Sequence, residues 1–206
     1  TLLKKPINQA IQRVLDSGIY VLGKEVSSFE QEFAHYSGLD YAIGVGNGTD
    51  ALFLSLKALG IGPGDEVITT PMTAAYSAFS VIYVGATPVF VDVHPDTFEI
   101  DETQLEQAIT KRTKAIIPVH LFGQPCNIQA IMTIAKRHKL KVIEDCCQAH
   151  GAQVGKRRVG TFGDVACYSF YPTKNLGCIG DGVAILTNHK ALAAKIRLLH
   201  NGHQTS

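Results

Sequence analysis

The feature that most constrains the fold of this chain is the alternation of two hydrophobic patterns from residue 41 onward. Short apolar runs rich in Val and Ile predict strands near 42–45, 65–69, 87–92, 113–119, 140–145, 165–170 and 183–187. The segments between them carry apolar residues at helical spacing and predict helices near 50–59, 74–84, 102–110, 128–138 and 189–200, with Asp101, Asn127 and Asn188 as N-caps. Strands that alternate with helices form a mostly parallel sheet covered on both faces. The sequence therefore predicts an α/β fold with a seven-stranded sheet.

Two further helices are expected before the first strand. Apolar residues between positions 7 and 15 share one helical face, and Gly18 follows as a C-terminal stop. Overlapping capping boxes that begin at Ser27 and Ser28 predict a second helix, which ends at Gly38. We expect these helices to lie against the main domain or against a partner chain. The chain is therefore divided into an N-terminal helical arm, residues 1–40, and a large domain, residues 41–206.

The composition is that of a folded protein with no strong charge. Of the 206 residues, 46% are hydrophobic, and 19 Lys plus Arg face 18 Asp plus Glu, which argues against disorder and against a nucleic-acid partner. The apolar runs are too short for a membrane span and the first six residues do not resemble a signal peptide, so we expect a cytoplasmic protein. The five Cys residues include no CxxC pair, which predicts reduced, packed thiols and no metal site.

Polar residues follow several of the predicted strands. Ligands of open α/β sheets bind outside the carboxyl ends of the strands, so these positions are the candidates for chemistry. They are Asn47-Gly48-Thr49-Asp50, Pro71-Met72-Thr73, His120, Asp145 to His150 and Ser169 to Lys174.

Three of these features suggest a charged ligand, although each also has an ordinary structural explanation. Gly48 and Thr49 open a helix and suit an anion, but a Gly-Thr helix start is more often a plain cap. Asp145 ends an apolar strand and suits a cationic nitrogen, but such a residue is often the cap of the next turn. Lys174 follows a strand among apolar and aromatic residues, but a lone lysine is usually a solvated surface charge.

The combination of these features is more specific than any one of them. A phosphate cradle, a carboxylate and a lysine at the ends of different strands match what pyridoxal phosphate requires: an anion site, a partner for the pyridine nitrogen and an amine for the Schiff base. A dinucleotide-dependent oxidoreductase fits less well, because Thr49 stands where the third glycine of GxGxxG would be.

Several sequence runs resemble a known family. GNGTDAL, GIGPGDEVITTP, GATPVFVDV, KAIIPVHLFG, VIEDCCQAHGA and SFYPTKNLG, with a GDG after the last, occur in one consistent order from about Gly18 to His200. In these runs the chain resembles the DegT-type sugar aminotransferases, which are fold type I pyridoxal phosphate enzymes of the aspartate aminotransferase superfamily. The fold implied is the large cofactor-binding domain of that type, without the C-terminal small domain that follows it in the family.

The resemblance implies roles for individual residues. Lys174 would form the Schiff base with pyridoxal 5'-phosphate, and Asp145 would pair with the pyridine nitrogen. Gln148 would lie by the cofactor ring and its phenolic oxygen. The phosphate would be held by Gly48, Thr49, the backbone of Asp50, and Ser169.

The activity implied is a two-stage transamination. An amino acid, usually glutamate in the family, would leave its amino group on the cofactor, which would then aminate a nucleotide-linked keto sugar in amino-sugar or surface polysaccharide biosynthesis. The GNGTDAL form and the run after Lys174 favour amination at the third sugar carbon. The family also implies a homodimer. The alternative is a non-catalytic or regulatory relative that binds the cofactor, or an inactive fragment of the enzyme.

Some residues depart from the family pattern or have uncertain roles. Ala74 stands near the position where the family usually has an aromatic residue that stacks on the cofactor ring, so either Tyr76 takes that place or Gln148 and small side chains suffice. His120 is expected to be a hydrogen-bonded histidine at a strand end, whereas His150 is as suited to ligand contact as to packing. Cys146 and Cys147 are expected to pack beside the carboxylate at the strand end.

Overall fold

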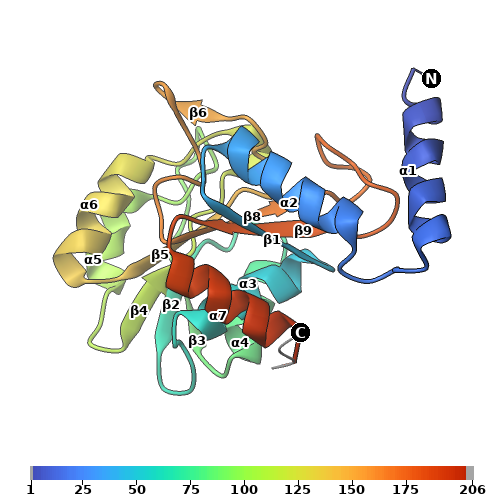
Figure 1. The fold of residues 1–206 in the computed structure, drawn as a ribbon. Helices are drawn as coiled ribbons and strands as arrows, with labels where there is room; N and C mark the ends of the chain where they lie inside the picture. Colours follow the sequence, from blue (N-terminus) through green and yellow to red (C-terminus); the bar gives the residue numbers. More distant parts are fainter. Residues whose placement is uncertain (1, 203–206) are drawn as a thin grey trace.

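The computed structural model describes residues 2–202 as a central sheet with helices on both of its faces (Figure 1). The main sheet has seven strands in the order β1-β9-β8-β5-β4-β2-β3. These strands are β1 (Tyr41–Val45), β2 (Glu66–Thr69), β3 (Thr87–Phe90), β4 (Thr113–Ile116), β5 (Lys141–Asp145), β8 (Val165–Ser169) and β9 (Val183–Thr187). The pairings from β3 through β8 are parallel, whereas β9 runs antiparallel to β8 and to β1. The predicted α/β fold with a mostly parallel seven-stranded sheet is confirmed.

Helices form a layer on each side of the sheet (Figure 1). One face packs against α3 (Gly48–Ala58), α4 (Tyr76–Tyr83) and α7 (Lys190–His200). The other face packs against α2 (Lys24–Ser37) at the β1-β9-β8 side and against α5 (Leu105–Ala108) and α6 (Ile128–His138) at the β4-β2 side. Short 3-10 turns, η1 (Glu102–Gln104) and η2 (Leu121–Gly123), lie in the connections.

The continuous apolar strand sequences follow from burial on both faces. In β5, Ile143 packs into the core with α3, α4 and α7, while its neighbour Val142 packs into the core with α6. Both side chains are fully buried. Because successive strand residues point to opposite faces, a sheet covered on both sides needs apolar residues at consecutive positions.

Two predicted helix starts are wrong. The second helix begins at Lys24, after Gly23, and not at the capping boxes of Ser27 and Ser28; the Ser27 hydroxyl instead donates to the Gly23 carbonyl oxygen. The earlier start places Glu25 in the first turn, where the helix dipole and Arg13, 2.7 Å away, stabilise its carboxylate.

Asn188 is not the N-cap of α7. His189 occupies that position, and the Asn188 side-chain oxygen accepts a hydrogen bond from the Asp40 backbone N–H at 2.9 Å. That contact joins segments 148 residues apart, so no local pattern could reveal it. The other two predicted caps are confirmed, since Asp101 accepts from the Thr103 N–H and Asn127 accepts from the Ala130 N–H.

The remaining predicted elements are present with small changes at their ends. The helix expected at 102–110 is a 3-10 turn followed by the four-residue α5. The Gly-rich stretch 151–163 also contains a short hairpin, β6 (Gln153–Val154) and β7 (Arg157–Arg158), which the sequence analysis did not predict. The stop signals at Gly18 and Gly38 are confirmed, because both glycines adopt the left-handed conformation at a helix end.

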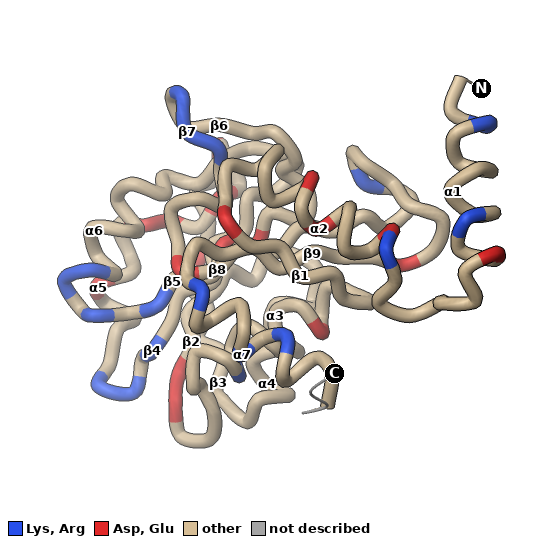
Figure 2. The backbone as a smooth tube through the Cα atoms, viewed as in Figure 1, with Lys and Arg blue, Asp and Glu red and all other residues tan. Residues whose placement is uncertain are grey.

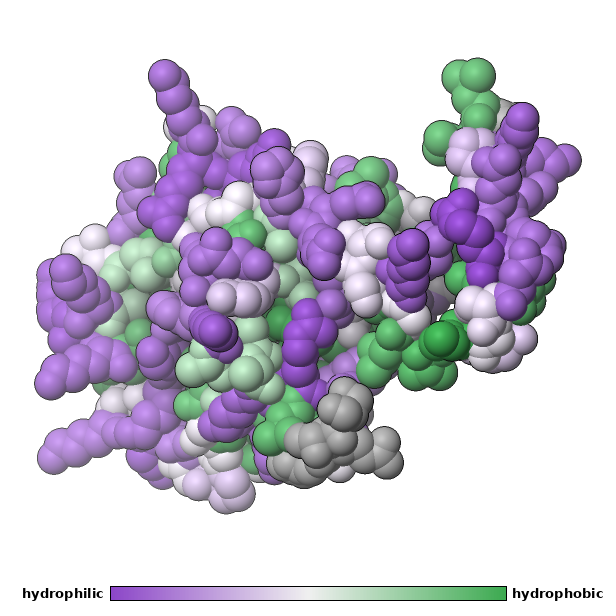
Figure 3. Space-filling model, in the orientation of Figure 1, coloured by the Kyte–Doolittle hydropathy of each residue, from purple (hydrophilic) through white to green (hydrophobic). Residues whose placement is uncertain are grey.

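The two N-terminal helices are placed differently. Helix α2 packs on the sheet, whereas α1 (Lys4–Ser17) projects from the body and has no buried residue (Figure 1). The large apolar side chains Ile7, Ile11 and Leu15 of α1 and those of residues 19–22 are exposed, and the space-filling view shows hydrophobic atoms where α1 meets this linker (Figure 3). A hollow of about 1020 Å³ lies between the linker, α2 and the segment 175–183. The division into an arm at 1–40 and a domain at 41–206 stays a prediction.

Charged residues lie mostly on the outer helices and turns, and the central strands carry few of them (Figure 2). Between residues 2 and 202, no helix is both long enough and apolar enough to cross a lipid bilayer.

Candidate active site

A cleft of about 720 Å³ opens at the carboxyl ends of the central parallel strands. The start of α3, the start of α4, the end of β5 and the turn after β8 form its walls. All of the residues that the sequence analysis selected for catalysis or cofactor binding line it: Gly48, Thr49, Asp50, Asp145, Gln148, Ser169 and Lys174. The structure thus brings together side chains that lie more than a hundred residues apart in the sequence.

The start of α3 presents backbone donors to the cleft. Asn47 is the N-cap, and its side-chain oxygen accepts from the Asp50 N–H at 2.9 Å while its amide nitrogen donates to the Asp50 carboxylate at 2.7 Å. The Asp50 N–H, one of the predicted phosphate donors, is therefore engaged by this cap. Within the described part of the chain, the N–H groups of Gly48 and Thr49 have no acceptor. A Cβ at Gly48 would meet no atom within 4 Å, so the backbone there is open to an anion.

Asp145 is held rigidly at the end of β5. One carboxylate oxygen accepts from the Cys147 backbone N–H at 3.1 Å, and the other accepts from the Ser77 hydroxyl at 3.2 Å. The side chain is 6% exposed, so little water reaches it. Ser77 was missed because a serine in a mostly apolar helix carries no signal of its own, and Ser80 is buried on the same face of α4. A buried carboxylate with a fixed orientation suits a cationic partner in the cleft.

Lys174 and Ser169 come from the segment after β8, the strand paired with β5. The chain turns there, since the Lys174 N–H donates to the Tyr171 carbonyl oxygen at 2.8 Å and the Tyr171 N–H donates to the Ser169 hydroxyl at 3.3 Å. Among the described residues, the Lys174 amine has no hydrogen bond or ion pair. It is a cleft lysine available to a ligand.

Gln148 is oriented by a residue that the sequence analysis did not select. The backbone N–H of Phe122 donates to the Gln148 side-chain oxygen at 2.8 Å. Because that oxygen is taken, the amide nitrogen of Gln148 is the end left to donate to a ligand. Phe122 reads in sequence as an ordinary core aromatic residue, yet its side chain is 76% exposed.

Glu144 and His120 form a fully buried pair behind the cleft. The Glu144 carboxylate accepts from the backbone N–H groups of Gly160, Phe162 and Gly163 and from His120 Nε2 at 3.1 Å. His120 Nδ1 accepts from a backbone N–H, which leaves the proton on Nε2. His120 is therefore the hydrogen-bonded strand-end histidine that the sequence analysis favoured, and it does not line the cleft.

A second buried carboxylate extends this region, which we call the rear cluster: Glu99, His120, Cys126, Glu144 and the backbone of 160–163. The Cys126 thiol donates to Glu99 at 2.9 Å, and Cys126 N–H is the group that donates to His120. Burial raises the pKa of Glu99 to about 7 and raises the pKa of the Cys126 thiol well above its usual value. The thiol therefore stays protonated at neutral pH.

His150, which the sequence left open between ligand contact and packing, lies outside the cleft. His150 lies among Phe33, Tyr168 and Phe170, and burial lowers its pKa. Neither ring nitrogen of His150 has a hydrogen-bond partner in the described structure. It does not line the cleft, so packing is the role that its position supports.

The wall of the cleft contains Cys147 and Ala74. Cys146 is fully buried and Cys147 lines the cleft, and burial raises the pKa of both thiols, so packing accounts for them as expected. Ala74 and Tyr76 both line the cleft. The Tyr76 side chain is 60% exposed, so the structure holds no aromatic residue of α4 buried over the site.

Comparisons with known proteins agree with this geometry. The family model described as the DegT/DnrJ/EryC1/StrS aminotransferase family matches residues 2–205. The chain is 50% identical to dTDP-3-amino-3,4,6-trideoxy-alpha-D-glucose transaminase of Streptomyces venezuelae over 97% of this chain and 52% of that protein. It is 51% identical to the Pleiotropic regulatory protein of Geobacillus stearothermophilus over 96% of this chain and 53% of that protein.

Solved structures show the same likeness. The structure of S. venezuelae DesV in complex with a ketimine intermediate superposes with a TM-score of 0.96 at 49% identity, covering 99% of this chain and 55% of that one. An aminotransferase from Brucella abortus gives a TM-score of 0.94 at 43% identity, with 99% and 57% covered. The chain spans about half the length of the curated relatives it matches.

Proposed function

Because the chain belongs to the DegT/DnrJ/EryC1/StrS aminotransferase family, we propose that its protein is a pyridoxal phosphate enzyme that moves an amino group from glutamate to a nucleotide-linked keto sugar. One observation carries the proposal: Asp145 and Lys174, from the ends of the paired strands β5 and β8, share one cleft with the open start of α3. Relatives whose names specify sugars aminated at the third carbon support amination at that carbon.

The residues present fit the cofactor. The N–H groups of Gly48 and Thr49, which have no acceptor among the described residues, suit a phosphate, and Ser169 adds a hydroxyl to the same cleft. Asp145, fixed by two hydrogen bonds, suits a protonated ring nitrogen. Gln148 has its amide nitrogen free to donate to an oxygen of the ring. Lys174 would hold the cofactor covalently through its amine.

When bound, pyridoxal phosphate supplies an electron sink that stabilises negative charge on the substrate carbon. Asp145 would keep the ring nitrogen protonated, since a buried carboxylate favours a nearby positive charge. After the incoming amino group has released it from the cofactor, the Lys174 amine would take the proton from the substrate carbon that bears the amino group and return it at the adjacent position on the other side of the nitrogen. Lys174 has no ion-pair partner in the described part of the chain, so no carboxylate there would hold the released amine away from that transfer.

The setting of the site is part of the same proposal. We infer a homodimer, which the exposed apolar surface of α1 and residues 19–22 supports, because large exposed apolar patches mark interaction surfaces. We also infer a cytoplasmic enzyme of amino-sugar or surface polysaccharide biosynthesis. The five free cysteines support a reducing compartment. Residues 41–206 would form the cofactor-binding domain and residues 1–40 its helical arm.

Absorption spectroscopy on the full-length protein tests the proposal. Addition of pyridoxal phosphate should give the visible band of a lysine-bound cofactor, and addition of glutamate should convert it to the pyridoxamine spectrum. Lys174→Ala should lose the band and reduce amino transfer by at least about 10⁴-fold, a loss of more than 5 kcal/mol of transition-state stabilisation. A band that persists in Lys174→Ala would refute the role of this lysine.

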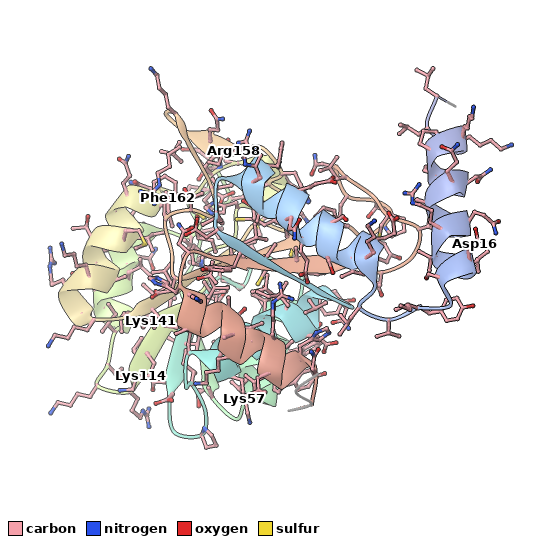
Figure 4. The ribbon with its side chains drawn as sticks, viewed as in Figure 1. Asp16, Lys57, Lys114, Lys141, Arg158 and Phe162 are labelled. Atoms are coloured by element: carbon pink, nitrogen blue, oxygen red, sulfur yellow. The ribbon has the colours of Figure 1, made fainter. Side chains whose placement is uncertain are left out.

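Lys114 provides a matched control variant away from the cleft. Lys114 is an exposed lysine at the start of β4, the opposite end from the cleft, and is labelled in Figure 4. Lys114→Ala should retain both the band and the turnover.

A second function is a regulatory protein that binds the cofactor without catalysis. Ala74 in place of the usual stacking residue and the likeness to a relative named as a regulatory protein favour it. A steady-state assay with glutamate and a nucleotide-linked 3-keto sugar distinguishes the two functions. An amino sugar among the products excludes a protein that only binds the cofactor.

A further inference from the structure

Phe122 has an unfavourable conformation in two respects. Its backbone φ of 53° and ψ of 17° lie in the left-handed region, which a bulky residue rarely adopts. Its apolar ring is 76% exposed. A conformation that is costly both in backbone strain and in exposed apolar surface persists only where the surroundings impose it, and such residues cluster at functional sites.

Hydrogen bonds on both sides impose this conformation. The Leu121 N–H donates to Glu99 at 3.1 Å, and the Phe122 N–H donates to Gln148 at 2.8 Å. Just beyond, the Gly123 N–H donates to the His120 carbonyl oxygen at 3.4 Å. The rear cluster thus clamps the turn η2 from behind, while Gln148 fixes it from the cleft side.

The clamp holds Phe122 in a hollow that adjoins the cleft. Phe122 lines a hollow of about 410 Å³ together with Gln148, Thr173, Lys174 and Asn175. Three of these residues, Gln148, Thr173 and Lys174, also line the main cleft, so the two spaces adjoin. A ligand that reaches Lys174 from this side passes the exposed face of the phenyl ring.

We propose that Phe122 contacts the acceptor substrate and contributes to specificity by packing its ring against the apolar C–H face of the sugar. The proposal rests on the function proposed above. A sugar ring has C–H groups on its faces and hydroxyl groups at its rim, so an exposed aromatic face is a complementary surface for it. Glutamate has no comparable apolar face and needs less of this contact.

The test compares the two half-reactions in the full-length protein loaded with pyridoxal phosphate. The amino donors are glutamate and dTDP-3-amino-3,6-dideoxy-α-D-galactose, the latter used in the reverse direction. Phe122→Ala should raise KM for the amino sugar about tenfold or more and lower the ratio of kcat/KM for the sugar to that for glutamate by a similar factor. Phe122→Tyr keeps an aromatic face and should restore the ratio to within about threefold of the wild type.

A second variant separates ligand contact from folding. Asn tolerates the left-handed region well, so Phe122→Asn should keep or raise the melting temperature while losing sugar selectivity as Phe122→Ala does. An unchanged ratio in Phe122→Ala would overturn the proposal. An equal loss in both half-reactions with a lower melting temperature would also overturn it, because it shows a structural role. A change from dimer to monomer in light scattering would overturn it as well, because the ring would then belong to the contact with a second copy.

Failure of the proposed function would look different. A wild-type protein that leaves the glutamate half-reaction undone refutes the aminotransferase itself, before Phe122 is tested. A wild-type protein that accepts glutamate but no dTDP-linked or UDP-linked 3-amino sugar refutes the sugar substrate and this inference together.

Discussion

The cleft and the rear cluster lie on opposite sides of the same strand end, and each contains one of two consecutive carboxylates. Glu144 points to the rear, where four donors from His120 and the 160–163 backbone saturate it. Asp145 points to the cleft, where the Ser77 hydroxyl and one backbone N–H are its only hydrogen-bond donors among residues 2–202. Because consecutive residues of a strand point to opposite faces of the sheet, the sequence predicts that Glu144 and Asp145 point away from each other. Which of the two can bind a ligand depends on the hydrogen bonds that each makes. A saturated carboxylate holds the fold, whereas a partly satisfied one is available to a ligand.

Among the variants that test this difference between the cleft and the rear cluster, Asp145→Asn should give the largest effect, and it acts on the cleft. Loss of the negative charge removes the partner of the ring nitrogen, so we expect kcat to fall about 10³-fold, equivalent to about 4 kcal/mol. Cofactor content and the free energy of unfolding should change little, because the amide oxygen can still accept from the Cys147 N–H and the amide NH₂ can donate to the Ser77 hydroxyl, which can also accept. Steady-state kinetics beside cofactor titration measures both. Equal turnover in the variant and the wild type would refute the role of Asp145.

Glu144→Gln should destabilise the rear cluster instead. The amide places an NH₂ group against backbone N–H donors in a fully buried site, which should lower the free energy of unfolding by about 2–3 kcal/mol. Urea denaturation should show a lower midpoint at an unchanged m-value. Glu32→Gln, at an exposed position of α2, is the control and should shift stability by less than about 0.5 kcal/mol. A stability equal to that of the control would show that the rear cluster does not hold the fold.

Glu99→Gln should show the effect of pH on the rear cluster. Burial raises the folded-state pKa of Glu99 to about 7 from 4.5, so between these values the folded chain keeps a proton that the unfolded chain has released. The free energy of unfolding should therefore fall as pH rises from about 4.5 to 7, by up to about 3 kcal/mol from this group. Glu99→Gln should remove that part of the slope and be the more stable protein at pH 8. Parallel stability curves for variant and wild type would contradict the shift.

Cys147→Ala should give the smallest effect. The Cys147 contact with Asp145 comes from its backbone N–H, which alanine keeps, and its thiol has a raised pKa and stays protonated at neutral pH. We expect kcat within about threefold of the wild type in the steady-state assay. A loss that approaches that of Asp145→Asn would mean that the thiol takes part in the chemistry.

Much of the fold and of the candidate site follows from the sequence, and the failures have identifiable causes. The strands were predictable because runs such as Val142-Ile143 are apolar on both faces. The predictions for the start of α2 and for Asn188 were wrong because contacts outside the local pattern are involved. Arg13 pairs with Glu25 in the first turn of α2, and the Asp40 N–H donates to the Asn188 side chain. The β6-β7 hairpin has two residues per strand and leaves no periodic signal.

The site residues show the same division. Gly48, Asp145 and Lys174 were predictable because the carboxyl ends of parallel strands converge on one edge of the sheet. Ser77 and Phe122 were not, since a serine in an apolar helix and a phenylalanine after a strand both suggest ordinary packing. Only the contacts of Ser77 with Asp145, and of Phe122 with Gln148, show that they border the cleft.

Sequence alone is enough to derive the α/β alternation, the edge of the sheet where polar residues gather, and the family to which the chain belongs, because periodicity and local motifs are properties of consecutive residues. Only the folded structure shows that Glu144 is saturated, that the Asp50 N–H is already taken by Asn47, and that the exposed Phe122 lies in a hollow with Gln148 and Lys174. These facts depend on which donors and acceptors the distant segments bring into reach, and a buried polar group takes the partners that surround it in the fold.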